Sequence, residues 1–292
     1  MRWEKISGEL LKLTKDLVFQ ELFGKQKNKE ITAHLLSLIL NREIKNIDLD
    51  VNKRMLGNRE NSKTGRLDIR AKFNDGEDCN IELQVEPYPY MDKRMLEYWG
   101  SMYDAKISSG DSYKVLKPTI SILIADYQIT NLKHISKYHT IWNLREKDYP
   151  NTILTNDIEM HILEIPKIND NEMLKDELVQ WLRFIKEPEN KGVEKFMEEN
   201  KYLKQARKEL EHLSGDPDFK RLLESRAGFL RDVDAKMEVA EEKGREEGKE
   251  EGKEEGKKQN QLEIAKKMKE ENIDIEQISR ITNLTSEEIE EL

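Results

Sequence analysis

Alternating hydrophobic and polar positions predict a β-hairpin across residues 65–86. Two alternating runs lie on either side of Asn74-Asp75-Gly76. Apolar residues take every second position in both runs, as on strands that bury one face. Asp and Gly tolerate the positive φ values of tight turns. The pattern therefore predicts two antiparallel strands joined at this turn.

The polar face of this hairpin brings together two carboxylates and an amide. Because residues opposite each other share a face, the turn must hold an odd number of residues. A three-residue loop, Asn74–Gly76, places Asp68 opposite Glu82, whereas a five-residue loop, Asn74–Asp78, places Asp68 opposite Gln84. Adjacent carboxylates repel unless one is protonated or a cation lies between them. The face is therefore either a cation site or an ordinary solvated hairpin face.

The rest of the first 190 residues mixes strand and helix patterns. Pro118–Ala125 is a nearly continuous apolar run, which predicts a strand buried on both faces. This mixture indicates an α/β domain. Further strands are predicted at 43–51, 138–145 and 157–165, and helices at 10–23, 30–40, 92–108, 172–185, 194–213 and 218–242.

The C-terminal part is polar and charged. It contains a glycine at every fourth position from Gly244 to Gly256. Each glycine costs a helix about 1 kcal/mol relative to alanine. This favours a flexible linker over a glycine ridge that would let two helices approach closely. The predicted organisation is a domain at 1–190, a charged helical extension at 191–242, a linker at 243–258 and a small helical module at 259–292.

The module at 259–292 resembles a helix-turn-helix. A helix is followed by a second helix from Asp274, a turn at Thr282–Leu284 and a short third helix. The third helix carries four glutamates, which phosphate would repel. The module is therefore expected to mediate protein interaction or oligomerisation, and a homo-oligomer is expected.

Composition narrows the class of protein. The chain has 292 residues, 37% of them charged, and a mean hydropathy of −0.84. No apolar run approaches the roughly 20 residues that span a bilayer, and the N-terminus lacks an apolar signal segment. Cys79 is the only cysteine, so no intramolecular disulfide forms. We therefore expect a cytoplasmic protein without a membrane partner.

The net charge of −9 argues against a nucleic-acid partner, but most of the negative excess lies after residue 190. Basic residues gather around the hairpin, where they either contact phosphate or form a solvated loop. They are Arg54, Arg59, Lys63, Arg66, Arg70 and Lys72.

Several segments together resemble a known family. GRLDI, NIELQ and KRMLEYWGSMYDAKISSGDSYKVLKPTISILI are similar to segments of the PD-(D/E)XK nuclease superfamily, and most of all to its recombination-promoting nuclease and transposase branch. KDLVFQELFG resembles the opening helix of that branch, and HILEI and WLRFI resemble later elements. The resemblance spans about Thr14 to Ile185. It implies a restriction-endonuclease-like core, a mixed central sheet flanked by helices, followed here by a helical C-terminal extension.

The resemblance also implies an activity. The implied activity is that of a metal-dependent DNA endonuclease, which would hydrolyse phosphodiester bonds and be linked to recombination or mobile elements. Asp68, Glu82 and the Leu83 backbone carbonyl would hold Mg²⁺ or Mn²⁺, with DNA as partner. The third catalytic position, usually lysine in the family, is Gln84 in this chain.

Four further residues are auxiliary candidates by the same resemblance. Asp16 would present a carboxylate from the first helix, Arg94 and Tyr98 would brace the carboxylates or touch phosphate, and Lys106 would supply the missing cation. Gln84 and the acidic charge also favour an alternative, a weak or inactive nuclease fold that binds DNA or oligomerises. Transposition itself ranks lowest, because no strand-transfer domain is evident.

Overall fold

The computed structural model describes residues 9–51, 69–169, 176–197 and 199–292. It divides into two compact units, Met1–Lys220 and Arg221–Leu292, each of which is described by itself. Among the described residues, no helix is both long and apolar enough to cross a membrane.

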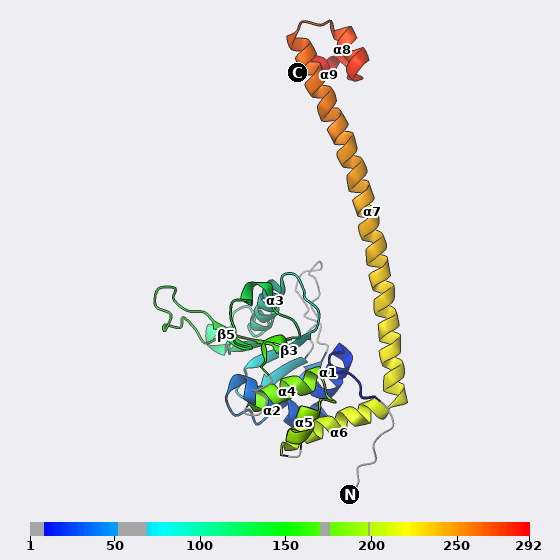
Figure 1. Ribbon diagram of the computed structural model, residues 1–292. Coiled ribbons are helices and arrows are strands. Elements are labelled where there is room, and N and C mark those ends of the chain that lie inside the picture. Colours follow the sequence, from blue (N-terminus) through cyan, green and yellow to red (C-terminus); the bar gives the residue numbers. More distant parts are fainter. Residues whose placement is uncertain (1–8, 52–68, 170–175, 198) are drawn as a thin grey trace. The chain divides into compact units, whose positions relative to one another are not determined.

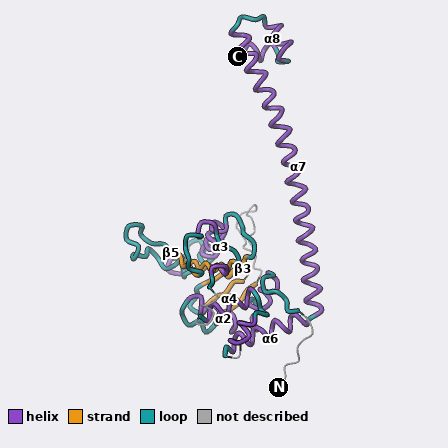
Figure 2. The backbone as a smooth tube through the Cα atoms, in the orientation of Figure 1, coloured by secondary structure: helices purple, strands orange, loops and turns teal. Residues whose placement is uncertain are grey.

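The first unit is built on a mixed sheet of six strands, in the order β1-β2-β3-β4-β6-β5 (Figures 1 and 2). Strands β1, β2 and β3 pair antiparallel, β3, β4 and β6 pair parallel, and β5 returns antiparallel to β6. This arrangement confirms the predicted α/β fold of the restriction-endonuclease-like type. The strands are β1 (Ile47–Val51), β2 (Ile69–Phe73), β3 (Asp78–Gln84), β4 (Thr119–Ala125), β5 (His139–Asn143) and β6 (Ile158–Glu164).

The hairpin of β2 and β3 has a three-residue loop. Ile69 pairs with Ile81 and Ala71 with Cys79, and the amide of Phe73 donates to the carbonyl of Glu77 at 2.9 Å. Gly76 has a φ of 89°, which glycine adopts without steric cost. The five-residue register is therefore excluded.

Helices cover both faces of the sheet (Figure 1). α3 packs on one face, and α1, α2, α4, α5 and α6 lie on the other. β4 is buried along its whole length, as its apolar run predicts. The helices of this unit are α1 (Asp16–Phe23), α2 (Lys29–Leu40), α3 (Met91–Asp104), α4 (Glu177–Lys186), α5 (Lys191–Met197) and α6 (Lys201–Gly215), with 3₁₀ turns η1 (Gln26–Asn28), η2 (Tyr113–Val115), η3 (Thr130–Leu132) and η4 (Ile165–Lys167).

The predicted boundary at residue 190 differs from the structure. α5 and α6 bury Val193, Leu203 and Leu210 within the first unit, which extends to Lys220. His34 of α2 stacks on Tyr202 of α6, with ring centroids 4.2 Å apart. The apolar residues of these helices recur at helical spacing, so they complete the helical layer and do not form a separate extension.

The predicted linker at 243–258 is helical in the structure, so this prediction is contradicted. It lies within α7 (Pro217–Glu270), a single helix of 54 residues. The residues between the glycines are mostly Glu and Lys, which are strong helix formers and offset part of the glycine cost. Lys243 and Glu247 also form an i,i+4 ion pair at 3.6 Å.

The end of the second unit has the predicted helices and turn. Asp274 caps the N-terminus of α8 (Ile275–Thr282), and its carboxylate accepts a hydrogen bond from the Glu276 amide. The backbone of Asn283 adopts the left-handed conformation, with a φ of 57°. A capping box begins α9 (Ser286–Glu290). A small core packs these helices on the end of α7: Ala265, Ile278, Leu284 and Ile289.

Replacing Gly244, Gly248, Gly252 and Gly256 with alanine should stabilise α7. A Cβ added at any of these positions meets nothing within 4 Å, and each change favours the helix by up to about 1 kcal/mol. The expected result is a higher melting temperature of the helical signal in far-ultraviolet circular dichroism. A flexible linker would leave that signal unchanged. Sedimentation of the same variant shows whether the glycine face serves self-association, because added methyl groups would then lower the mass in solution.

Candidate functional site

Glu82 is buried beneath α3. It pairs with Leu123 of β4, whose side chain belongs to the core under α3, so Glu82 shares that face of the sheet. Its exposed fraction is 2%, and its Oε1 lies 2.8 Å from Nη2 of Arg94 in α3. Of the two alternatives for this face, the ordinary solvated face is therefore excluded at Glu82. The polar face of β3 is covered by α3, and Arg94 of that helix supplies the counter-charge to Glu82.

Arg94 links this carboxylate to the surface. Its Nε donates to Tyr98 Oη at 2.8 Å, so Tyr98 holds the guanidinium that pairs with Glu82. Arg94 keeps 28% of its side chain exposed, whereas Tyr98 is buried. Burial, and next the charge of Glu82, raise the pKa of Tyr98, so its hydroxyl stays protonated. Arg94, held by Tyr98, thus gives Glu82 a counter-charge in a largely dry environment.

Gln84 lies two residues further along β3 and therefore on the same face as Glu82. It is partly exposed, and its amide nitrogen donates to the carbonyl of Glu86 at 3.1 Å. The Leu83 side chain is buried on the opposite face, and Leu83 pairs with Ile124 of β4. Glu82, the Leu83 backbone and Gln84 thus gather at the carboxyl end of β3.

Lys106 is not brought to Glu82. Its Nζ donates to the carbonyls of Lys117 and Pro118, both at 2.9 Å, and lies 3.5 Å from Asp78. Asp78 begins β3, four residues before Glu82, which is roughly 13 Å along a strand. Burial lowers the pKa of Lys106, while the Asp78 carboxylate opposes that change. This lysine holds the opposite end of β3.

Of the two other predicted carboxylates, the structure describes only Asp16, and it lies apart from this group. Asp16 begins α1 on the other face of the sheet, where its Oδ1 accepts from the Leu17 amide at 2.7 Å. Asp68 lies outside the described residues, one position before β2. The described part of β2 has the register of the three-residue loop.

Sequence reasoning missed a second ion-pair group on the same face. Asp78 accepts from Arg70 at 2.9 and 3.2 Å, and Asn80 accepts from Ser121 at 2.7 Å. The signal was present, because Asp78, Asn80, Glu82 and Gln84 alternate along β3. Arg70 is therefore held by Asp78, and the part of the predicted basic patch that precedes it lies outside the described residues.

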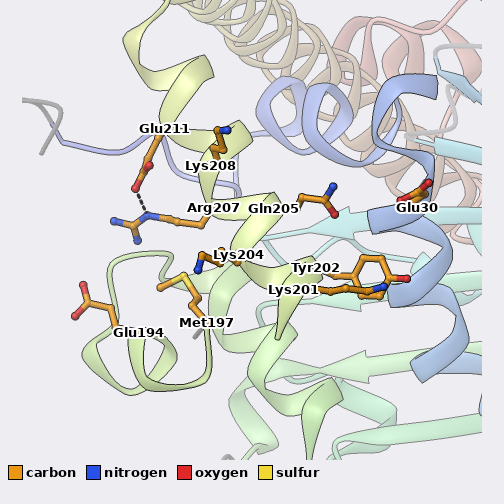
Figure 3. A pocket seen from close by; sticks show the side chains of 10 residues that line it. All are labelled: Glu30, Glu194, Met197, Lys201, Tyr202, Lys204, Gln205, Arg207, Lys208 and Glu211. Atoms are coloured by element: carbon orange, nitrogen blue, oxygen red, sulfur yellow. Dashed lines mark hydrogen bonds and ion pairs between the residues drawn. The ribbon is translucent and has the colours of Figure 1, made fainter. Parts of the chain in front are cut away.

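The structure has a hollow of about 720 Å³ elsewhere, on the helical layer that lies across the sheet from α3 (Figure 3). Charged side chains of α5 and α6 line most of it, and Arg207 and Glu211 form an ion pair at its edge. None of the predicted site residues lines it. We therefore place the candidate site at β3 and α3.

Within the described ranges, no three His, Cys, Asp or Glu side chains are grouped closely enough to hold a metal ion. One expected ligand, Asp68, falls outside those ranges. The donors that the structure does place at the end of β3 are all oxygens: the Glu82 carboxylate, the Leu83 carbonyl and the Gln84 amide.

Comparison with known proteins agrees with the fold. A family model described as PD-(D/E)XK nuclease family transposase matches residues 13–240, which is most of the chain. No curated protein and no solved structure gives a match. The match includes the hairpin, α3 and the whole described sheet. The chain therefore belongs to the PD-(D/E)XK nuclease family transposases.

Proposed function

We propose that the protein is a metal-dependent DNA endonuclease that hydrolyses phosphodiester bonds during recombination or the movement of mobile elements. Its family membership supports a nuclease function of the transposase-like kind. The observation that carries this proposal is the buried Glu82 carboxylate, held by Arg94 with Gln84 beside it at the end of β3.

The donors fit a hard divalent cation. Glu82, the Leu83 carbonyl and Asp68 would hold Mg²⁺ or Mn²⁺, both of which prefer oxygen ligands. Arg94 already balances the charge of Glu82, so the second carboxylate of Asp68 is needed to favour a doubly charged ion. When bound, such a cation lowers the pKa of its water and offsets negative charge on the phosphate.

The side chains have separate roles in this proposal. Hydrolysis adds a water oxygen to phosphorus and breaks the bond to the leaving sugar oxygen, which takes up a proton. The amide oxygen of Gln84 orients the water by accepting a hydrogen bond from it. A neutral amide does not remove a proton from the water, so Gln84 does not act as the base. Arg94 pairs with Glu82 and holds it in place, and because 28% of its side chain is exposed, it can also offer its charge to the phosphate.

Two observations favour a second candidate, a weak or inactive nuclease fold that binds DNA. Gln84 supplies no charge, and Lys106 is engaged with Asp78 at the other end of β3. Such a protein would bind DNA without cutting it.

Nicking of supercoiled plasmid decides between the two candidates. The full chain is incubated with Mg²⁺ and, as the control, with EDTA. The proposed endonuclease converts supercoiled plasmid to open circles only when Mg²⁺ is present. Plasmid that is retarded in a gel but stays supercoiled in both conditions would identify the binding protein.

A further inference from the structure

A second hollow, of about 600 Å³, opens beside the candidate site. It lies between the segment that follows β3, the first turns of α3 and the segment that follows β4. Most of its lining is apolar, and it includes four aromatic side chains: Tyr88, Tyr90, Tyr127 and Trp142. We call it the aromatic hollow. The chain reaches it at Pro87, three residues after Gln84, so it continues from the end of β3 that carries Glu82.

The rings of the aromatic hollow are unusually exposed. Tyr90 is 70% exposed, Tyr88 49% and Trp142 40%. Large aromatic side chains are normally buried on folding, and an exposed group of them marks a binding surface. The hollow also falls within the volume range of ligand sites.

Its rings are held in place by stiff backbone. Pro87 and Pro89 fix φ on either side of Tyr88. Tyr90 has a φ of 65°, in the left-handed region that a residue with a Cβ rarely adopts. That conformation costs about 1–2 kcal/mol. The fold thus holds an exposed ring in a conformation that glycine would adopt at lower cost.

Cations accompany these rings. The Arg94 guanidinium lies 5.2 Å from the Tyr88 ring centroid, and the Lys93 ammonium lies 5.1 Å from that of Tyr90. Arg94 is the same residue that pairs with Glu82, so one side chain joins the aromatic hollow to the carboxylate. Asp92 is the charged side chain that lines the hollow itself, so a phosphate would lie outside it, towards Lys93 and Arg94, which contact the rings without lining the hollow.

Flat rings beside cations match the two parts of a nucleotide. A base stacks on an aromatic face whatever its sequence, and the phosphate is drawn to Arg and Lys. Bases inside a duplex already stack on each other, so only unpaired bases can enter. We propose that the aromatic hollow binds unpaired nucleotides next to the cleavage site, which makes single-stranded or locally unpaired DNA the preferred substrate. This inference rests on the proposed function for the chemistry, but binding itself tests it separately.

The experiment measures binding by the full chain in EDTA, so that no cleavage occurs. Fluorescence anisotropy compares a labelled single-stranded oligonucleotide with its duplex. Tyr90→Gly removes the ring and suits the left-handed backbone, so the variant should fold as well as the parent or better. We expect it to bind the single strand about tenfold more weakly, because one stacked base is lost, with little change for the duplex. Tyr90→Trp should restore binding, since stacking needs a ring and not a hydroxyl group.

Tyr113→Ala is the matched control, because Tyr113 is 82% exposed and does not line the aromatic hollow. Unchanged single-strand affinity in Tyr90→Gly would overturn the inference, as would an equal loss for single strand and duplex. A change in sedimentation between the Tyr90→Gly variant and its parent, without a change in oligonucleotide affinity, would assign the hollow to a second copy of the chain and also overturn it. If the parent binds through the hollow but cuts nothing with Mg²⁺, the proposed hydrolysis fails while this inference stands.

Discussion

Glu82→Gln should abolish Mg²⁺-dependent nicking of plasmid while the protein stays folded. The amide keeps the shape of the side chain and still accepts a hydrogen bond from Arg94, which lies 2.8 Å away. It removes the negative charge that would bind the cation. We expect a loss of about 100-fold or more, since even outer partners of metal ligands are worth about 10- to 100-fold. Asp68→Asn should cause a comparable loss.

Glutamine is chosen over alanine because Glu82 is buried. Glu82→Ala would leave Arg94 without its counter-charge, and breaking a buried pair costs about 3–5 kcal/mol, less here because Arg94 is partly exposed. Glu82→Ala is therefore expected to lower the stability of the protein, which would confuse a test of activity.

Glu159→Gln is the matched control for the charge change. Glu159 is partly exposed on β6, faces the other side of the sheet and contacts His161 at 2.8 Å, so its loss should leave nicking unchanged. Thermal melting adds an independent measurement. Mg²⁺ should raise the melting temperature of the parent but not of Glu82→Gln, because a ligand stabilises only the state that it binds. A Glu82→Gln protein that nicks as fast as its parent would remove Glu82 from the mechanism.

Asp78→Ala should cause the largest loss of stability. The Asp78 carboxylate is buried and accepts two hydrogen bonds from Arg70, while Lys106 lies 3.5 Å away. Both cations are largely buried, so removing the carboxylate leaves two positive charges with less compensation. We expect the free energy of unfolding to fall by about 3–5 kcal/mol. Urea denaturation followed by circular dichroism measures this change.

Asp148→Ala is the control, because Asp148 is exposed and such a change usually alters stability by less than about 0.5 kcal/mol. If Asp78→Ala does not fold, Asp78→Asn can replace it, because the amide keeps the shape of the side chain. Its loss of free energy of unfolding should lie between the losses expected for Asp78→Ala and Asp148→Ala. A double-mutant cycle with Arg70→Ala should give a coupling energy of about 0.5–3 kcal/mol. A coupling energy near zero would mean that the Asp78–Arg70 pair contributes nothing to stability.

Local pattern was sufficient for most elements of the sheet. The alternation beside Asn74-Asp75-Gly76 predicted β2 and β3, and the unbroken apolar run predicted β4 as a central strand. These predictions succeed because side-chain period and turn chemistry act between near neighbours in the chain. The same locality explains why the caps at Asp274 and Thr285 mark the last helices.

The helicity of residues 243–258 was predicted wrongly from local cost alone. The summed cost of the four glycines predicted a flexible linker. Helix formation is cooperative, however, and the segment continues a helix that begins at Pro217. Propagation from an existing helix needs no new nucleus.

The sequence by itself determined the polar face of β3 and the candidates on it, namely Glu82 and Gln84 with Asp68 before them. Only the tertiary structure decided that α3 covers this face, that Arg94 pairs with Glu82 and that Lys106 pairs with Asp78. A polar strand face has the same alternation whether water or a helix covers it. The pairings form only after β3, α3 and β4 have docked, when residues far apart in the chain exchange water for each other.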